Sequence, residues 1–285
     1  MKFAAPESKV TAMTANNYTF GDNDQASARL RRLAELYEPE TREWLQRCGA
    51  QSPHLAVDLG CGPGWSTRLL QQVVGADRTV GLDASERFIA EARNNNNGDA
   101  GVEFAVHDIT HAPFPVAAPN VLSCRFLLTH LRAPDVVLAT WASIAAPHAL
   151  LIVHETESLE TDHPALRRYY ELVAQMQDHY GQTLRVGGVL DACIENSGWR
   201  LRESRRHSVE RPARSMAEIH LANLRTWRHD EFARRSFDPA EIDLIEESLA
   251  RIASGVENAG VAVNAARQII AQRAWAERFD QPVLA

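Results

Sequence analysis

Short apolar runs alternate with amphipathic stretches through the middle of this 285-residue chain. Five of the runs have the composition of buried strands: residues 55–59, 79–83, 102–108, 120–126 and 149–155. Between them, apolar residues recur at three- and four-residue steps, which predicts helices at 65–74, 85–94 and 134–146. Repeated β-α units of this kind predict an α/β fold with a Rossmann-like, doubly wound, mostly parallel sheet.

The regions before and after these units are predicted to be mainly helical. Residues 23–50 place Leu30, Leu33 and Leu36 on one helical face, but Pro39 predicts a break and therefore two helices. After residue 155, the pattern predicts helices at 164–180 and 188–196 and strands at 199–209 and 261–274, which brings the sheet to seven strands.

Two capping-box patterns predict further helices near the end of the chain. Ser215 with Glu218 starts one that reaches Trp227, and Asp238 with Glu241 starts one that reaches Ile252. We therefore expect an N-terminal helical cover at 1–50 and a core at 51–285. Insertions at 157–186 and 211–258 are expected to form a helical cap over the carboxyl edge of the sheet.

Composition and charge narrow the class of protein. Apolar residues make up 45% of the chain and no apolar run is long enough to span a membrane, while the N-terminus is polar, so a cytoplasmic protein is expected. The net charge of −7 argues against nucleic-acid binding, which depends on clustered basic residues. The arginines near position 205 are interpreted as a charged sheet edge. Four widely spaced cysteines predict neither disulfides nor a metal site.

A glycine-rich turn follows the first predicted strand, in the stretch V-D-L-G-C-G-P-G-W-S-T at 57–67. Ligands bind at this edge of open α/β sheets, and glycine allows the backbone to approach them closely. The dinucleotide fingerprint would need glycine where the chain has Trp65, and a phosphate-binding P-loop would need a lysine that the turn lacks. Both phosphate interpretations are therefore excluded.

The spacing Gly-x-Gly-x-Gly after Asp-Leu instead resembles the S-adenosylmethionine (SAM) motif of class I methyltransferases. Asp83 ends the second strand, where its carboxylate can accept hydrogen bonds from ribose hydroxyls; the alternative is an N-cap for the helix that starts near Ser85. The resemblance implies that Asp108 and the backbone N–H of Ile109 meet the adenine, although Asp108 can also be a turn residue.

The same resemblance extends more weakly to the flanks. The N-terminal segment resembles the cover that small-molecule methyltransferases fold over SAM, with Tyr18 and Arg29 as partners for the cofactor carboxylate; the alternative for Arg29 is a surface arginine. The residues expected to bind SAM are Tyr18, Arg29, Asp58, Gly60, Gly62, Gly64, Asp83, Ala84, Asp108, Ile109 and Arg125. S-adenosylhomocysteine is the expected product, and no metal is expected.

Three residues are candidate general bases for an acceptor that must lose a proton. They are His130, His154 and Glu155, near the ends of strands four and five. Strand alternation sends His154 and Glu155 to opposite faces, so at most one of them faces the ligand. A carboxylate or a neutral amine acceptor would need none of the three. His130 can equally be a packing residue.

The acceptor is expected to be a small molecule of specialised or cofactor metabolism. The turn after strand four, Ser123 to Phe126, lacks the Asn/Asp-Pro-Pro-aromatic motif of enzymes that methylate nucleobases or glutamine. Lysine occurs only at positions 2 and 9, so the lysine-containing tetrad of ribose methyltransferases cannot form. Seven cap residues offer aromatic and titratable surface for the acceptor pocket: Tyr169, Tyr170, His179, Tyr180, His220, Trp227 and His229. No more than three of them are expected to contact the ligand, and the others are expected to pack in the core of the cap.

Two alternatives stay open at this point: an RNA or protein methyltransferase, and a SAM-binding member of the fold that transfers no methyl group. The expected partners include neither a nucleic acid nor a membrane. The sequence also leaves open whether the protein forms a homodimer. It leaves open, too, whether the methyl group is transferred to oxygen, nitrogen or carbon.

Overall fold

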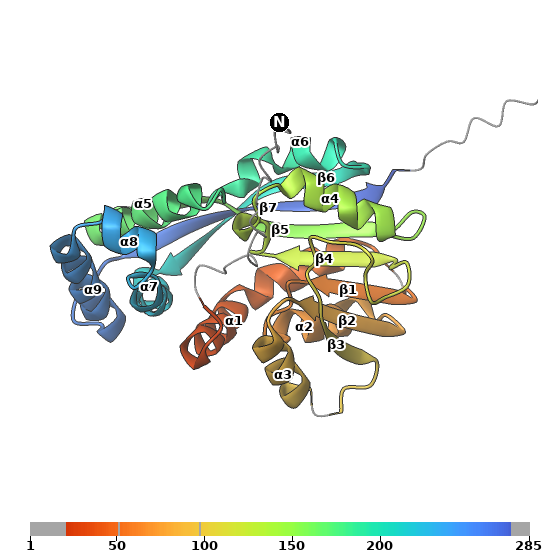
Figure 1. Ribbon diagram of the computed structural model, residues 1–285, viewed down its shortest axis with the longest axis horizontal. Coiled ribbons are helices and arrows are strands. Elements are labelled where there is room, and N and C mark those ends of the chain that lie inside the picture. The colour runs from red at the N-terminus through yellow and green to blue at the C-terminus, as the bar shows by residue number, and fades with distance from the viewer. Residues whose placement is uncertain (1–20, 51, 97, 275–285) are drawn as a thin grey trace, which may run out of the picture.

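The computed structural model describes residues 21–50, 52–96 and 98–274. Its centre is a seven-stranded sheet with strand order β3-β2-β1-β4-β5-β7-β6 (Figure 1). Strands β1 to β5 pair in parallel, whereas β7 runs antiparallel to both β5 and β6. This topology confirms the predicted Rossmann-like, mostly parallel α/β sheet. The strands are β1 (Leu55–Leu59), β2 (Arg78–Asp83), β3 (Val102–Val106), β4 (Val121–Arg125), β5 (Leu150–Thr161), β6 (Trp199–Pro212) and β7 (Val261–Arg273).

Helices cover both faces of the sheet, because neighbouring strand residues point to opposite faces and both sets are apolar. Ala56 of β1 packs in the cluster that holds Trp44 of α1 and Leu70 of α2. The next residue, Val57, belongs to the cluster that holds Trp141 of α4 together with residues of α6. These helices are α1 (Asp24–Arg47), α2 (Trp65–Val74), α3 (Glu86–Asn95), α4 (Pro134–Ile144) and α6 (Leu190–Glu195), with short 3-10 turns η1 (Leu128–His130) and η2 (Val186–Val189).

The first helix is continuous, so the prediction of two helices before β1 was wrong. Pro39 lies inside α1, where it removes one backbone hydrogen bond. The helix is nevertheless held on both sides of the proline, because Tyr37 and Trp44 are buried. The Trp44 indole also donates to the carbonyl of Ile269, 3.4 Å away on β7. Packing on the sheet therefore outweighs the local cost of the proline.

A second group of helices lies beyond the long ends of β5, β6 and β7, at the left of Figure 1. Leu172 of α5, Leu224 of α7 and Leu249 of α9 are fully buried in an apolar cluster of their own. Asp238 caps α9 as predicted, with its side chain accepting from the N–H of Ala240 at 3.0 Å. The predicted Ser215 cap was wrong, because α7 already begins at Ala213. The helices are α5 (Pro164–His179), α7 (Ala213–Trp227), α8 (Glu231–Ser236) and α9 (Pro239–Ser254).

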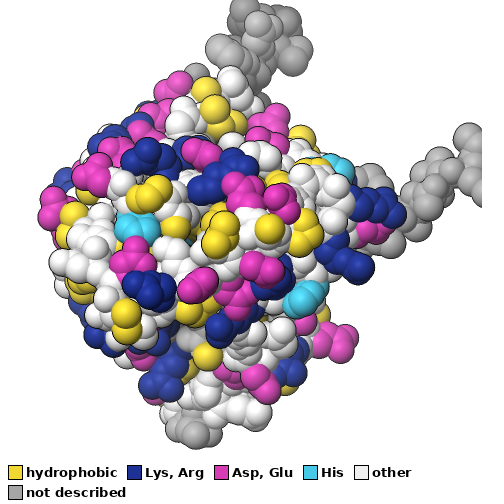
Figure 2. Space-filling view, turned by 90° about the vertical axis from the view of Figure 1, so that its left-hand side faces the viewer, with side chains coloured by type: hydrophobic (Ala, Val, Ile, Leu, Met, Phe, Trp, Pro, Cys, Tyr) yellow, Lys and Arg dark blue, Asp and Glu magenta, His cyan; other side chains and the backbone are white. Residues whose placement is uncertain are grey.

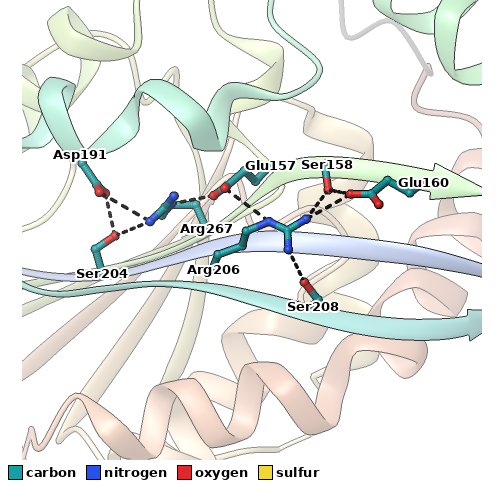
Figure 3. Close-up of polar contacts among 8 residues, drawn as sticks. All are labelled: Glu157, Ser158, Glu160, Asp191, Ser204, Arg206, Ser208 and Arg267. Carbon is teal, nitrogen blue, oxygen red and sulfur yellow. Dashed lines mark hydrogen bonds and ion pairs between the residues drawn. The ribbon is translucent and has the colours of Figure 1, made fainter.

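Arginines on the antiparallel part of the sheet are paired with acids. Arg267 of β7 donates to Glu157 of β5 at 2.7 Å and lies 3.6 Å from Asp191 of α6 (Figure 3). Arg206 of β6 reaches Glu157 and Glu160 in the same network. These cations tie β5, β6 and β7 to one another and to α6.

The surface over the cap helices carries both signs of charge. Figure 2 shows arginine and acidic side chains intermixed on this face. Several of them form pairs, such as Arg228 with Asp243 and Arg168 with Glu241. Within residues 21–50, 52–96 and 98–274, no helix combines the length and the apolar character that crossing a bilayer requires.

Candidate functional site

A cavity of about 810 Å³ opens at the carboxyl ends of the parallel strands. The glycine turn after β1 and the segments that follow β2, β3 and β4 form one side of it. Residues of α1, α5 and α7 form the other side. The sheet edge predicted to hold the ligand is therefore enclosed by helices from distant parts of the chain.

The glycine turn has a backbone that only glycine adopts easily. Gly60, Gly62 and Gly64 all have positive φ, at +67°, +53° and +89°. A Cβ on Gly60 would lie 2.5 Å from the Leu127 side chain, and one on Gly64 would lie 2.8 Å from Phe104. Gly60 and Gly62 line the cavity, whereas Gly64 is not among the lining residues. Gly64 is needed for packing and for the start of α2, and the structure does not bring it to the cavity.

The Asp83 carboxylate joins the glycine turn to the start of α3. Its two oxygens accept from the N–H groups of Gly62 and Ser85, each at 2.9 Å. Burial raises the pKa of Asp83, although these two hydrogen bonds oppose the rise. The N-cap of α3 is Ser85, whose hydroxyl accepts from the N–H of Phe88, so the alternative role of Asp83 as that cap was wrong. Asp83 and Ala84 both line the cavity.

Asp58 supports the glycine turn from inside the sheet and does not reach the cavity. It is buried in β1 and accepts from the hydroxyls of Ser66 and Thr67, each at 2.7 Å. Burial raises its pKa to about 6. Because Asp58 does not line the cavity, the structure gives it no contact surface for a ligand there.

Asp108 and Ile109 line the cavity from the turn after β3. Burial acts to raise the pKa of Asp108, but hydrogen bonds from Thr110 and His111 outweigh it and hold that pKa below its usual value. The carbonyl of Ile109 accepts from the indole of Trp141 at 2.9 Å, which fixes the turn on α4. Both residues reach the cavity, but β3 ends at Val106 and not at Asp108 as predicted, so they lie two and three positions beyond the strand.

The exit from β4 completes this side of the cavity. Arg125 lines it and donates to the Thr41 hydroxyl of α1 at 3.0 Å. Phe126 has a φ of +52°, a left-handed conformation that turns the chain sharply into η1. His130, the last residue of η1, also lines the cavity, beside Gln177 of α5 on the side formed by the helices.

Comparisons with known proteins agree with this geometry. Residues 56–148 match a family model described as a methyltransferase domain. Trans-aconitate 2-methyltransferase of Acidovorax sp. (strain JS42) is 32% identical over 133 residues, which are 47% of this chain and 49% of that protein. The chain thus spans about half the length of the curated relative.

Two solved structures share the fold at low sequence identity. Geranyl diphosphate methyltransferase in complex with SAM superposes with a TM-score of 0.52 at 14% identity, covering 90% of this chain and 94% of that one. The cyclase SpnF superposes with a TM-score of 0.50 at 16% identity, covering 81% of this chain and 80% of that one. The chain therefore contains a stretch, residues 56–148, that matches a methyltransferase domain, and it has the fold of class I SAM-dependent methyltransferases.

Two of the three candidate bases of this methyltransferase domain lie away from the cavity. Neither His154 nor Glu155 is among the lining residues. The His154 ring packs edge-on against Tyr37 and Phe126 in a buried site, 3.3 Å from the amide of Gln268. Burial lowers the pKa of His154 to about 3.

Glu155 is turned into the protein rather than toward a ligand. One carboxylate oxygen accepts from the N–H groups of Leu127 and Leu128, at 2.7 and 2.8 Å. Its side chain is fully buried, and burial raises its pKa to about 7. Glu155 therefore holds the loop that leads to His130. At most one of His154 and Glu155 was expected to face the ligand; neither lines the cavity, because both are enclosed by neighbouring strands and loops.

The side of the cavity opposite the glycine turn is built by α1, α5 and α7. Three of the seven predicted cap residues line it: Tyr169, Tyr170 and His220. The rings of Tyr169 and His220 are stacked with centroids 4.6 Å apart, and the Tyr170 hydroxyl lies 3.1 Å from His220 Nε2. The other four, His179, Tyr180, Trp227 and His229, are not lining residues.

Sequence reasoning missed two polar residues of this side, Gln177 and Asn223. Gln177 lies two helical turns after Tyr169 on α5, and Asn223 lies one turn after His220 on α7. Helical spacing from the aromatic candidates could therefore have found both. Arg29 of α1 lines the cavity and is buried, so the alternative of a surface arginine was wrong. Tyr18 lies outside the described residues.

Proposed function

We propose that the protein transfers the methyl group of SAM to a small-molecule acceptor. The observation that carries the proposal is the position of Asp83, which lines the cavity while bound to the backbone of the glycine turn. A carboxylate oxygen has room for a second hydrogen bond, so Asp83 can accept from ribose hydroxyls without giving up its backbone partners. The matched family model supports the same donor.

The residues of the cavity fit the cofactor. Gly60 and Gly62 leave the turn free of side chains, which allows the backbone to contact a bound molecule. Asp108 and the N–H of Ile109 are proposed to bind the adenine, and Arg125 to contact the cofactor near β4. In this proposal Asp58 and Gly64 support the turn and do not bind the cofactor themselves.

The protein's part in the reaction is alignment and exclusion of water. A sulfonium already activates the methyl group that SAM supplies, so the acceptor atom has to be held about 3 to 3.5 Å from it and in line with the breaking bond. Helices α1, α5 and α7 enclose the cavity and provide the surfaces that can orient an acceptor. The cytoplasmic location, the homodimer, the absence of nucleic-acid partners and the division into cover, core and cap stay predictions.

Isothermal titration of SAM against Asp83→Ala and Asp83→Asn tests the donor site. We expect SAM affinity to fall by at least about 30-fold, since hydrogen bonds to a charged group contribute about 1.5 to 3 kcal/mol each. Asp77→Asn is the control, because Asp77 is exposed and paired only with His54 among the described residues. Unchanged affinity in both Asp83 variants would refute the proposed site.

The reaction is tested with tritiated SAM and three acceptor pools: small metabolites, total RNA and total protein. We expect label in the small-molecule pool alone. Strong label in RNA or protein would support the macromolecular alternative. Tight SAM binding without any S-adenosylhomocysteine would instead support a member of the fold with another activity.

A further inference from the structure

Two groups of polar residues line the cavity, in addition to Arg125 at the end of β4. Among its described lining residues, the carboxylates are Asp22, Asp83 and Asp108. Asp83 and Asp108 follow β2 and β3, and Asp22 joins them by accepting from the Ser85 hydroxyl at 2.9 Å. We call this side, with Gly60 and Gly62, the cofactor half.

The described residues of the second group include no carboxylate. We call it the cap half; it consists of Arg29, His130, Tyr169, Tyr170, Gln177, His220 and Asn223. Arg29 is 7% exposed, and its positive charge lowers the pKa of both His130 and His220. A buried guanidinium close to these rings favours an anionic group and disfavours an ammonium group.

The described residues of the cap half offer no group suited to removing a proton. Burial first, and Arg29 second, lower the pKa of His130 and of His220 to about 3, so both imidazoles are neutral and weakly basic. Burial raises the pKa of Tyr169 to about 12, so its hydroxyl keeps its proton. Glu155, another of the candidate bases, does not line the cavity and binds backbone N–H groups instead.

Gln177 further restricts His130. The Gln177 amide nitrogen lies 3.3 Å from His130 Nδ1 and 3.5 Å from the carbonyl of Thr129. Because that carbonyl can only accept, it favours the amide orientation in which Gln177 donates to both atoms. Nδ1 is then the acceptor, and Nε2 carries the proton and can only donate. The Nε2 atom of His130 is thereby set as a hydrogen-bond donor and not as a proton acceptor.

An acceptor that must lose a proton does not suit these residues, whereas a carboxylate needs no base. We propose that the acceptor group is a carboxylate bound by Arg29 in the cap half, and that the product is a methyl ester. This rests on the proposed methyl transfer. A carboxylate oxygen forms the new bond to the methyl carbon, the carbon–sulfur bond breaks, and its electron pair stays on sulfur in S-adenosylhomocysteine. No proton is transferred.

The linkage formed by the protein tests this chemistry directly. Protein and tritiated SAM are incubated with trans-aconitate and with the dialysable small-molecule fraction of a bacterial extract, and the product is then treated with alkali. Methyl esters release volatile labelled methanol, whereas methyl ethers, methylamines and C-methyl products do not. Volatile label is the expected result.

The failures of the two proposals are distinguishable in the same assay. Alkali-stable label would overturn the carboxylate proposal while methyl transfer to small molecules stands. Absence of S-adenosylhomocysteine from every incubation would overturn methyl transfer, and the carboxylate proposal with it.

Arg29→Gln tests the residue assigned to the acceptor. We expect the KM for the labelled acid to rise about 10- to 100-fold, because an ionic hydrogen bond is lost, and the Kd for SAM to change less than about threefold. Arg42→Gln is the matched control on the same helix, where Arg42 pairs with Glu38 at the surface. Arg29→Lys keeps the charge and is expected to restore part of the affinity.

The contrary result is equally specific. If the Kd for SAM rises in Arg29→Gln while the KM for the acid does not, Arg29 binds the carboxylate of the cofactor, as the sequence predicts, and its assignment to the acceptor is overturned. Circular dichroism and thermal melting of each variant separate these effects from unfolding.

Discussion

The two halves of the cavity differ in how their polar groups are satisfied. In the cofactor half, the Asp83 and Asp108 carboxylates already accept hydrogen bonds from the turns around them. In the cap half, buried polar atoms of Gln177, His220 and Asn223 have no hydrogen-bond partner among the described residues. The carboxylates of the first group are positioned by protein partners before a ligand binds and can still accept further hydrogen bonds, whereas the second group leaves polar atoms that only a ligand can satisfy among the described residues.

This difference separates two kinds of recognition. The cofactor half is a backbone cradle, so its binding properties depend on positions where a side chain cannot be added. The cap half is proposed to bind through side chains on α1, α5 and α7 and on the 3-10 turn η1, so single substitutions there can change the acceptor without disturbing the cofactor. Substitutions on each side should therefore have separable effects.

The largest effect is expected for Gly60→Ala in the cofactor half. The new Cβ would lie 2.5 Å from the Leu127 side chain, at a φ of +67°. We expect a loss of about 2 to 5 kcal/mol in the free energy of unfolding, from overpacking and left-handed strain together, and no measurable SAM binding by titration.

Gly75→Ala is a matched control for this change. Gly75 has a φ of +65°, but a Cβ there would meet nothing within 4 Å. Gly75→Ala should lower the free energy of unfolding by only about 1 to 2 kcal/mol, the strain of an alanine in the left-handed conformation, and should leave SAM affinity unchanged. Equal effects of the two substitutions on SAM affinity would show that close approach at Gly60 has no role.

The same division explains what the sequence could predict. The bounds of β1 and α2 match the prediction residue for residue, because the apolar run and the glycine turn between them are local signals. Asp83 and Asp108 were found because parallel strands end at one edge of the sheet. The cofactor half is thus built from short-range patterns at successive strand ends.

Long-range packing decided what the sequence did not predict. The predicted helix break at Pro39 is absent, because the Trp44 indole of the same helix donates a hydrogen bond to the carbonyl of Ile269, 225 positions away. β5 continues to Thr161, beyond its predicted end, because β7 pairs along its whole length. The cap half brings Arg29 beside residues from α5 and α7, and no local pattern indicates that these three helices meet.

A smaller effect is expected at Glu155, which holds the loop between the two halves. Burial raises its folded-state pKa from 4.5 to about 7, so the folded protein keeps a proton that the unfolded chain releases. The stability from this group is present at low pH and is lost as pH rises toward 7. Relative to Glu155→Gln, the wild type should lose up to about 3 kcal/mol of unfolding free energy between pH 4.5 and pH 7.

Urea unfolding across this pH range measures the difference. Glutamine keeps a carbonyl to accept from Leu127 and Leu128, so the loop should be preserved while the titration disappears. Glu247→Gln, on the exposed side of α9, is the control and should leave the pH dependence as it is. If the difference in unfolding free energy between the wild type and Glu155→Gln does not change with pH, Glu155 is not a buried group that binds a proton on folding.

The smallest effect is expected for His130→Gln in the cap half. If His130 donates a hydrogen bond and takes no proton, kcat should fall less than about tenfold, since one hydrogen bond contributes about 1 kcal/mol. Removal of a general base typically lowers the rate by about 10²- to 10⁴-fold. Steady-state kinetics of S-adenosylhomocysteine formation distinguish these magnitudes, with the exposed His54→Gln as control.

The pH profile of His130→Gln sharpens the same distinction. With a carboxylate acceptor and a donor His130, kcat should be flat between pH 6 and pH 8 in both wild type and variant, because neither the acceptor carboxylate nor His130 changes its protonation in that range. A loss above a hundredfold, together with a wild-type kcat that falls toward low pH, would make His130 the base. The acceptor would then be a hydroxyl or an amine, and the cap half would supply a proton acceptor as well as the surface that binds the acceptor.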